Sequence, residues 1–313
     1  MKTVKVGDKI IGDGHPCFIS VEPGATHTGL ESAKKLAKAA KEAGADAVKF
    51  QTMVTDEVMS QEAKKLMIEF GTKEGKKKES IYDALKRREL SFDEWRKLKE
   101  YCDEIGILFI SALSGPSTVD LLADINAAAI KVAKSDVNNT YMIRLIAKKG
   151  LPLILDAREK FQDVENALRI CEEEGNDKVI IMHCPSGYPA EFAGIHLKVI
   201  PFIKGIFDRP VAYSDHSIGD FMNFAALGLG ANMLEKTITL DKHTNAVEHY
   251  MSLEPHEIKN FINKVREVEK AFGNPRVIFN SRVKIANRRS IMTKRKIPKG
   301  KTIEVDDLTF KRP

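Results

Sequence analysis

The chain has 313 residues, of which 43% are hydrophobic and 30% are charged, and its formal net charge is +6. A chain of this length and apolar content can bury a large core, which excludes disordered and fibrous proteins. No stretch reaches the roughly 18 apolar residues of a membrane helix. The four cysteines are too sparse for a disulfide framework, so we expect a soluble cytoplasmic protein that binds no membrane.

The opening segment VKVGDKIIGDG predicts a small β-hairpin. Amphipathic stretches with helical periodicity then alternate with eight short runs rich in Val, Ile and Phe. These runs lie at 17–22, 47–52, 107–113, 128–135, 153–157, 179–184, 211–214 and 232–240. Buried strands that are each followed by a helix predict an α/β protein with a closed (β/α)8 TIM barrel, capped below by the hairpin. No GxGxxG follows the first strand, which disfavours an open dinucleotide-binding sheet.

We expect the barrel domain to span 1–273, followed by a linker at 274–286 and a short C-terminal segment at 287–313 that cannot bury a core of its own. Within the barrel, the charged run at 73–79 predicts a solvated loop. Residues 270–313 carry 13 Lys and Arg against 3 acidic residues. This basic tail suits docking against an acidic surface of the same or a neighbouring subunit. Aromatic residues do not interleave it, so nucleic-acid binding is disfavoured.

In a (β/α)8 barrel the active site lies at the carboxyl ends of the strands, and polar residues are dense there. In chain order they are Glu22, His27, Lys49, Gln51, Ser111, Ser114, Lys131, Lys134, Ser135, Asp136, Asp156, Arg158, His183, Ser186, Tyr188, Ser214, Asp215, His216, Glu235, Lys236 and Thr237. Ionisable residues on buried strands are costly unless they are paired or used. Four lysines among them predict a pocket for a small anionic substrate, although each lysine could instead form a structural ion pair.

Several segments are similar to the sialic acid synthase family, which includes the legionaminic and pseudaminic acid synthases. They are IGDGHPCFISVEPGATHTG, AAKEAGADAVKFQT, MHCPSGYPAE, VAYSDHSIG, LEKTITLD and MSLEP, and they occur in the family's order. The closing RRSIMTKRKIPKGKTIEVDDLTFKRP resembles the beginning of that family's C-terminal antifreeze-like domain. The resemblance covers nearly the whole chain and implies the same barrel, as a divergent member with a truncated antifreeze-like domain.

The resemblance implies condensation of phosphoenolpyruvate with an amino-sugar aldehyde, which gives a 2-keto-3-deoxy sugar acid and phosphate. It also implies a homodimer. Lys49 and Lys131 would hold the phosphoenolpyruvate anion with help from Ser214, and Gln51 and Tyr188 would contact the sugar. Glu22 would be the acid/base group. Asp136, where the family has an acid, would orient or activate water. Beside these carried-over residues, the strand ends offer Lys134 as a further catalytic candidate and Ser186, Asp156 and Arg158 as substrate-binding candidates.

The resemblance further implies a divalent metal ion, Mn or Mg, with His216 as one ligand. The second histidine of the family is replaced by Thr237. One histidine alone makes a poor divalent site, unless Glu22, Asp156 or His183 substitutes as a ligand. Lys134 stands where the family has a small serine, and Asp156 lies in a segment where the family has STGM. We therefore expect Lys134 and Asp156 to form a new charge pair inside the pocket.

Two alternatives remain open at the level of sequence. In the first, Lys134 or Lys131 is desolvated in the barrel, has a depressed pKa and forms a Schiff base, as in an aldolase or transaldolase. In the second, the protein is a non-catalytic, sugar-binding relative. Trapping of an imine, or saturable binding without turnover, would separate them from the synthase.

Overall fold

A parallel β-barrel forms the centre of the computed structural model, which describes residues 2–273 and 289–312. The chain divides into two compact units, Met1–Lys270 and Ala271–Pro313. The predicted linker at 274–286 lies outside the described residues. The described helices include none that is long and apolar enough to cross a membrane.

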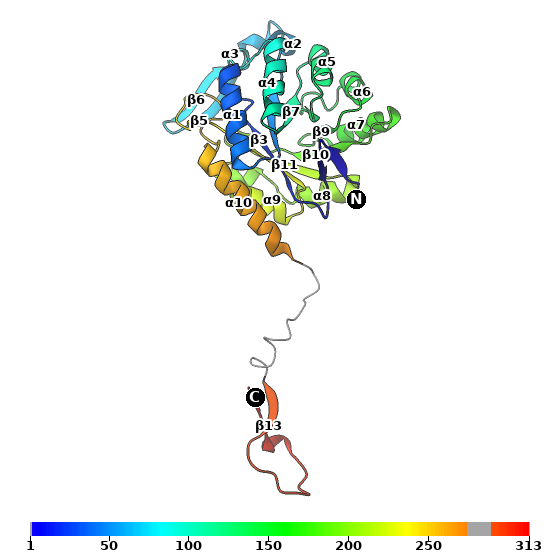
Figure 1. Cartoon of the computed structure of the whole chain (residues 1–313), viewed down its shortest axis with the longest axis vertical. Coiled ribbons are helices and arrows are strands. Elements are labelled where there is room, and N and C mark those ends of the chain that lie inside the picture. The colour runs from blue at the N-terminus through cyan, green and yellow to red at the C-terminus, as the bar shows by residue number, and fades with distance from the viewer. Residues whose placement is uncertain (1, 274–288, 313) are drawn as a thin grey trace. The chain divides into compact units, whose positions relative to one another are not determined.

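The predicted closed barrel is confirmed, and its eight strands all run parallel (Figure 1). They are β3 (Phe18–Glu22), β4 (Ala47–Gln51), β7 (Leu108–Ala112), β8 (Ala129–Val132), β9 (Leu153–Asp156), β10 (Val179–His183), β11 (Val211–Asp215) and β12 (Met233–Thr237). The barrel closes where β12 pairs with β3, and Thr237 lies opposite Glu22 in that register. Because all strands are parallel, their carboxyl ends meet at one end of the barrel.

Helices surround the strands (Figure 1). They are α1 (Leu30–Ala43), α4 (Phe92–Glu104), α5 (Pro116–Asp124), α6 (Thr140–Lys148), α7 (Phe161–Glu173), α8 (Val199–Phe207), α9 (Phe221–Gly228) and α10 (Pro255–Phe272), with the short η2 at Phe192–Gly194. In α1 the buried residues recur at helical spacing, from Ala33 through Leu36, Ala37 and Ala40 to Ala43. The helix ends at Gly44, whose φ of 93° is the left-handed conformation that favours glycine. These apolar faces pack on the outward-facing strand residues and form the main core.

The predicted N-terminal hairpin is also confirmed, with β1 (Val4–Val6) antiparallel to β2 (Lys9–Ile11). Its buried Val4, Val6 and Ile11 pack in one cluster with barrel residues such as Phe18, at the amino end of β3. The hairpin therefore caps the amino end of the barrel and leaves the carboxyl end for a site.

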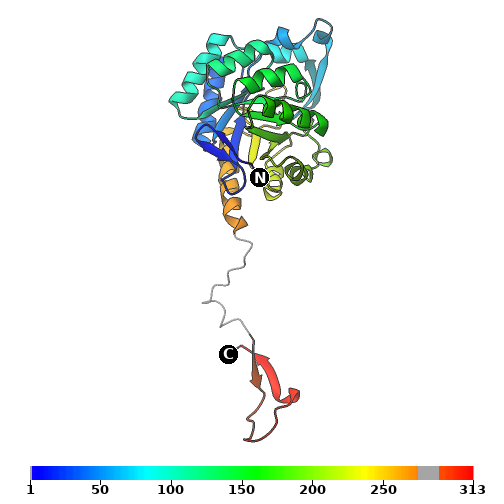
Figure 2. The same cartoon turned by 90° about the vertical axis from the view of Figure 1, so that its right-hand side faces the viewer.

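A second hairpin corrects the prediction of a solvated loop at 73–79. β5 (Met67–Thr72) pairs antiparallel with β6 (Gly75–Ser80). Along the chain, α2 (Thr55–Val58) and η1 (Ala63–Lys65) precede this hairpin, and α3 (Ile81–Lys86) follows it. The charged run hid the strand because β6 buries none of its residues fully. The amide N–H of Gly71 donates to the Tyr188 carbonyl at 2.7 Å, which ties the hairpin to the carboxyl end of the barrel. Figures 1 and 2 show the two hairpins, blue and cyan, at opposite ends of the barrel.

The C-terminal unit contains an antiparallel pair, β13 (Ser290–Thr293) with β14 (Leu308–Lys311), and the short η3 (Val305–Asp307). Asp307 is buried and pairs with Arg295 and Lys301, each at 2.8 Å. Part of the basic charge of this segment is thus matched inside the segment itself.

Candidate active site

A cluster of buried charged side chains fills the carboxyl end of the barrel. Lys49 Nζ lies 3.0 Å from Oε1 of Glu235 and 3.5 Å from Oε1 of Glu22, the last residue of β3. Lys131 Nζ lies 3.5 Å from the same Glu235 oxygen, and Ser214 Oγ donates to that oxygen at 2.8 Å. The barrel therefore brings four residues that the sequence assigned to the site together around Glu235 of β12. They are Glu22 of β3, Lys49 of β4, Lys131 of β8 and Ser214 of β11.

The position of Glu22 depends on close packing next to it. Gln51 Nε2 donates to Glu22 Oε1 at 2.9 Å. A Cβ atom at Gly24 would collide with Glu22 Oε1 and would lie 2.9 Å from Gln51 Cγ. The glycine two residues after the strand therefore leaves the space in which the Glu22 carboxylate and the Gln51 amide meet.

Lys131 and Glu235 stabilise each other's charged forms, and Lys49 also stabilises the Glu235 carboxylate. Burial alone would raise the pKa of Glu235, but Lys131 and Lys49 outweigh it and lower that pKa below its ordinary value. Burial alone would lower the pKa of Lys131, but the Glu235 carboxylate outweighs it and raises that pKa. Lys131 therefore stays an ammonium ion, whereas a Schiff-base lysine must lose its proton before it attacks a carbonyl.

The expected charge pair between Lys134 and Asp156 is wrong. Asp156 is paired with Arg158, whose Nη2 donates to Asp156 Oδ2 at 2.6 Å and to Cys184 Sγ at 2.7 Å. Lys134 is in the turn after β8, where its side chain is 49% exposed and pairs with Glu159 at 3.2 Å. It fails the condition of a desolvated nucleophile because the turn points it to solvent.

Other predicted site residues have contacts apart from the lysine cluster. Asp136 is half-buried in the same turn and accepts a hydrogen bond from Ser135 at 2.8 Å. Within the described ranges no hydrogen bond or ion pair joins it to the lysine cluster. Ser186 is exposed, whereas Tyr188 is partly buried and its ring centroid lies 5.2 Å from that of His216.

The donors that would hold a divalent metal ion are His216 and Thr237. His216 Nδ1 and Thr237 Oγ1 are both buried and unpartnered by the residues that the structure describes. Burial and the neighbouring Lys131 and Arg158 lower the pKa of His216, so its ring is neutral. One imidazole and one hydroxyl beside these cations do not fit a protein-held Mn or Mg site, which usually has several carboxylate or histidine ligands.

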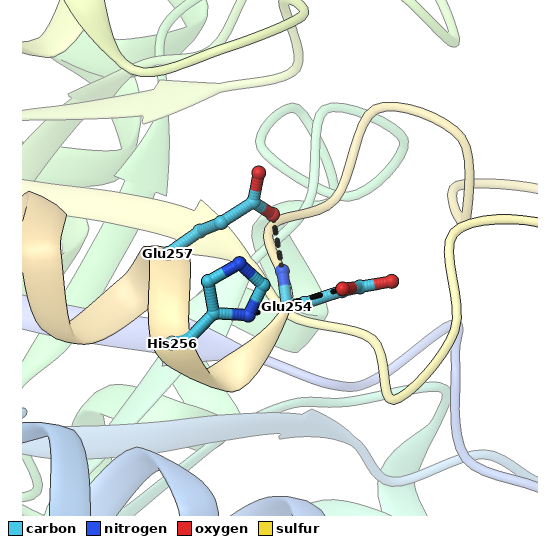
Figure 3. A group of neighbouring side chains, drawn as sticks. All are labelled: Glu254, His256 and Glu257. Atoms are coloured by element: carbon cyan, nitrogen blue, oxygen red, sulfur yellow. Dashed lines mark hydrogen bonds and ion pairs between the residues drawn. The ribbon is translucent and has the colours of Figure 1, made fainter.

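Across the described parts of the chain, the one group of three such ligand atoms within 4.8 Å of each other is elsewhere, at the start of α10 (Figure 3). Glu257 Oε2 accepts the N–H of Glu254 at 2.8 Å and its other oxygen pairs with Lys242. His256 Nδ1 lies 3.9 Å from Glu254 Oε2. These carboxylates already cap a helix and pair with a lysine, which accounts for the cluster without an ion.

Two residues of the strand-end set are structural. Lys236 Nζ donates to Asp215 Oδ2 at 2.9 Å and to the Ser217 carbonyl at 2.6 Å. Neither Asp215 nor Lys236 is exposed to solvent. Alternation along β12 places Lys236 on the face opposite Glu235 and Thr237, so this lysine points away from the cluster. The pair holds the turn that carries His216. A separate strand-end residue, His183, bonds the Ile195 carbonyl at 2.6 Å, as an interior histidine does.

Sequence reasoning missed Glu248 and Arg88, and it gave no role to Glu235. Glu248 lies in the loop between β12 and α10, and Arg88 follows α3; both are buried. Burial, and then the nearby charge of Glu22, raise the pKa of Glu248 to about 8. Neither residue lies in a strand or in one of the segments that resemble the sialic acid synthase family. The sequence signal for Glu248 was an acidic residue directly after the apolar Val247.

Comparison with known proteins decides the family. The model of the NeuB family matches residues 36–276. The chain belongs to the NeuB family. The predicted resemblance to the sialic acid synthases is confirmed, because curated relatives carry such names. An N,N'-diacetyllegionaminic acid synthase of Legionella pneumophila is 32% identical over 98% of this chain and 88% of its own length. A human N-acetylneuraminate-9-phosphate synthase is 34% identical over 96% of this chain and 84% of its own length.

Solved structures agree with this family assignment. An N-acetylneuraminic acid synthetase of Leptospira borgpetersenii superposes with a TM-score of 0.78 at 26% sequence identity. The match covers 90% of this chain and 93% of that one. The NeuB barrel of this chain is therefore similar to a solved synthetase along almost its full length.

Proposed function

We propose that this NeuB-family protein condenses phosphoenolpyruvate with the open-chain aldehyde of an amino sugar, forming a 2-keto-3-deoxy sugar acid and releasing phosphate. The observation that carries the proposal is the convergence of Lys49 and Lys131 on Glu235, beside Glu22. Two buried ammonium groups suit a ligand that carries both a carboxylate and a phosphate. The names of the relatives support the same chemistry.

In the proposed reaction, Lys49 and Lys131 bind the phosphoenolpyruvate anion and balance its charge. C3 of phosphoenolpyruvate attacks the aldehyde carbon, and water adds to C2. Glu22 accepts one proton from that water, and the former aldehyde oxygen takes up a proton and becomes a hydroxyl group. The hydroxyl group formed on C2 gives its remaining proton to the departing phosphate as the C2–O bond to phosphate breaks and the C2 ketone forms. Gln51 and Tyr188 line the side of the site that receives the sugar. We derive no step through a metal ion, because His216 and Thr237 do not fit one.

The test is phosphate release from phosphoenolpyruvate with a panel of acceptors: N-acetylmannosamine, its 6-phosphate, and a 2,4-diacetamido hexose. We expect release with at least one acceptor, together with a keto acid whose mass equals acceptor plus pyruvate. Lys131→Met should lower turnover by about 10²-fold or more, the usual effect of losing one buried electrostatic contact to a reacting group. Lys134→Met is the matched control, since that lysine is exposed.

Saturable sugar binding without phosphate release would support the non-catalytic reading instead. Borohydride trapping of a keto substrate on a lysine would support the Schiff-base reading, which the exposure of Lys134 and the raised pKa of Lys131 oppose.

A further inference from the structure

Glu248 is held at the pocket by contacts on both sides of it in the chain. Val247 packs with Phe70 of β5 and Ala84 of α3, and its N–H donates to Glu79 Oε1 at 3.2 Å. On the other side, the ring of His249 is hydrogen-bonded through Nδ1 to Thr239 Oγ1 at 2.7 Å. The hairpin and the loop after β12 therefore fix the backbone at Glu248.

The backbone at Glu248 is in an unfavourable conformation for its residue type. Its φ is 71°, in the left-handed region that a side chain with a Cβ atom rarely adopts. Ser252 Oγ donates to the Glu248 carbonyl at 2.7 Å and supports this turn. Strain of this kind persists only where the surrounding structure imposes it, and it is concentrated at functional sites.

The carboxyl group of Glu248 is buried and incompletely paired. The residue is 7% exposed, and its Oε2 has no hydrogen-bond partner among the residues that the structure describes. A buried polar atom without a partner is costly unless a ligand completes it.

The charges that face Glu248 come from several elements. Glu22 of β3 acts on it most strongly, followed by Arg88 after α3, Lys49 of β4 and Lys131 of β8. Burial, and then the charge of Glu248, raise the pKa of the Tyr188 phenol, which lies in the loop after β10. The Glu22 charge is therefore the strongest of these on Glu248, and Tyr188 packs against the same apolar cluster as the neighbouring Val247.

Glu22 and Glu248 are a pair of carboxyl groups in opposite settings. Glu22 Oε1 lies 3.5 Å from Lys49 Nζ and accepts a hydrogen bond from Gln51 Nε2 at 2.9 Å. Burial and the Glu22 charge favour the protonated form of Glu248, which can donate a hydrogen bond. Two carboxyl groups whose surroundings differ in this way are the usual acid and base of an active site.

We propose that Glu248 is the general acid that protonates the aldehyde oxygen of the acceptor as the carbon–carbon bond forms, an assignment that rests on the proposed condensation. The π electrons of phosphoenolpyruvate form the new bond to the aldehyde carbon. The C=O electron pair then takes the Glu248 proton and becomes a hydroxyl group. Water adds to C2 and passes one proton to Glu22. The second water proton leaves with the phosphate as the C2–O bond to phosphate breaks and the C2 ketone forms. Transfer of that proton from Glu22 to Glu248 after phosphate leaves restores both groups. The acid supplies the activation of the aldehyde that His216 and Thr237 do not provide through a metal ion.

The test compares Glu248→Gln, Glu248→Asp and the wild type in steady-state assays between pH 6 and pH 10. The wild-type kcat/KM should fall as the pH rises through the pKa of Glu248, because the acid loses its proton. Glu248→Gln should lower kcat by about 10²-fold or more, the usual effect of a positioned acid, and should lose this alkaline decline. Glu248→Asp should retain part of the activity and keep the decline. Glu74→Gln, on the exposed hairpin tip, is the matched control and should match the wild type.

Three outcomes would overturn the assignment. In the first, Glu248→Gln keeps the wild-type kcat and shows only a raised KM for the sugar, as a hydrogen bond to a sugar hydroxyl would give. In the second, its alkaline decline is unchanged. In the third, the infrared difference spectrum of wild type minus Glu248→Gln at pH 7 lacks the band of a protonated carboxyl group. These results in an active wild type overturn the role of Glu248 alone, whereas a wild type without turnover overturns the condensation and this role together.

Discussion

Removing either member of the buried pair between Asp215 and Lys236 should destabilise the barrel, by unequal amounts. After Lys236→Met, Asp215 keeps four donors: Ser217 N and Oγ at 2.9 and 2.7 Å, Asn223 Nδ2 at 2.6 Å and Tyr213 Oη at 3.2 Å. After Asp215→Asn, Lys236 keeps only the Ser217 carbonyl among the contacts described for it, and an amide N–H replaces an acceptor. Breaking a buried pair from one side costs about 3–5 kcal/mol. We expect that full cost for Asp215→Asn and about 2–3 kcal/mol for Lys236→Met.

The assay is urea-induced unfolding of the two single variants and the double variant in the full chain. The double variant should be less destabilised than the sum, with a coupling of about 2 kcal/mol, because neither charge is left alone. The matched control is the more exposed pair of Lys264 and Asp220, which lie 3.1 Å apart. The double-mutant cycle for this exposed pair should give a coupling energy of less than about 1 kcal/mol. Additive effects at Asp215 and Lys236, within about 0.5 kcal/mol, would refute the reasoning.

Three further predictions follow from the same contacts. His27 packs in a T-shaped arrangement with Phe50 and Trp95, and burial lowers its pKa from 6.5 to about 4. The unfolded chain binds the proton more tightly, so stability should be full above pH 6.5 and should fall by about 3 kcal/mol as the pH drops to 4. His27→Phe should reduce this dependence of the unfolding free energy on pH, measured from unfolding curves between pH 4 and pH 7. An unchanged dependence would show that other groups cause it. Lys134→Ala should leave turnover nearly unchanged and should change the free energy of unfolding by less than about 0.5 kcal/mol, because the ion pair of Lys134 is exposed. Loss of turnover in this variant would restore the Schiff-base hypothesis. Dialysis against EDTA should change turnover by less than about twofold, and Thr237→His should create stimulation by Mn²⁺. Wild-type activity that needs added metal would contradict this.

The sequence alone predicts the barrel because the alternation of buried strands and amphipathic helices is a local pattern repeated along the chain. Lys49, Lys131, Glu22 and Ser214 could be placed at one end of the barrel for the same reason, since parallel strands share a direction. The partner of each charged side chain could not be predicted from the sequence pattern. Arg158 rather than Lys134 reaches Asp156, because the direction of a side chain in a turn depends on backbone angles that no pattern encodes.

The sequence by itself determined the family, the eight strands and the strand-end lysines, all of which depend on residue type and spacing. The tertiary structure decided which of those charges are functional. It paired Lys236 with Asp215 and exposed Lys134 to solvent. It also buried Glu248, from the loop after the last barrel strand, where the charge of Glu22 acts on it. The physical reason is that burial and neighbouring charge, which control protonation, are properties of the packed chain rather than of any segment of it.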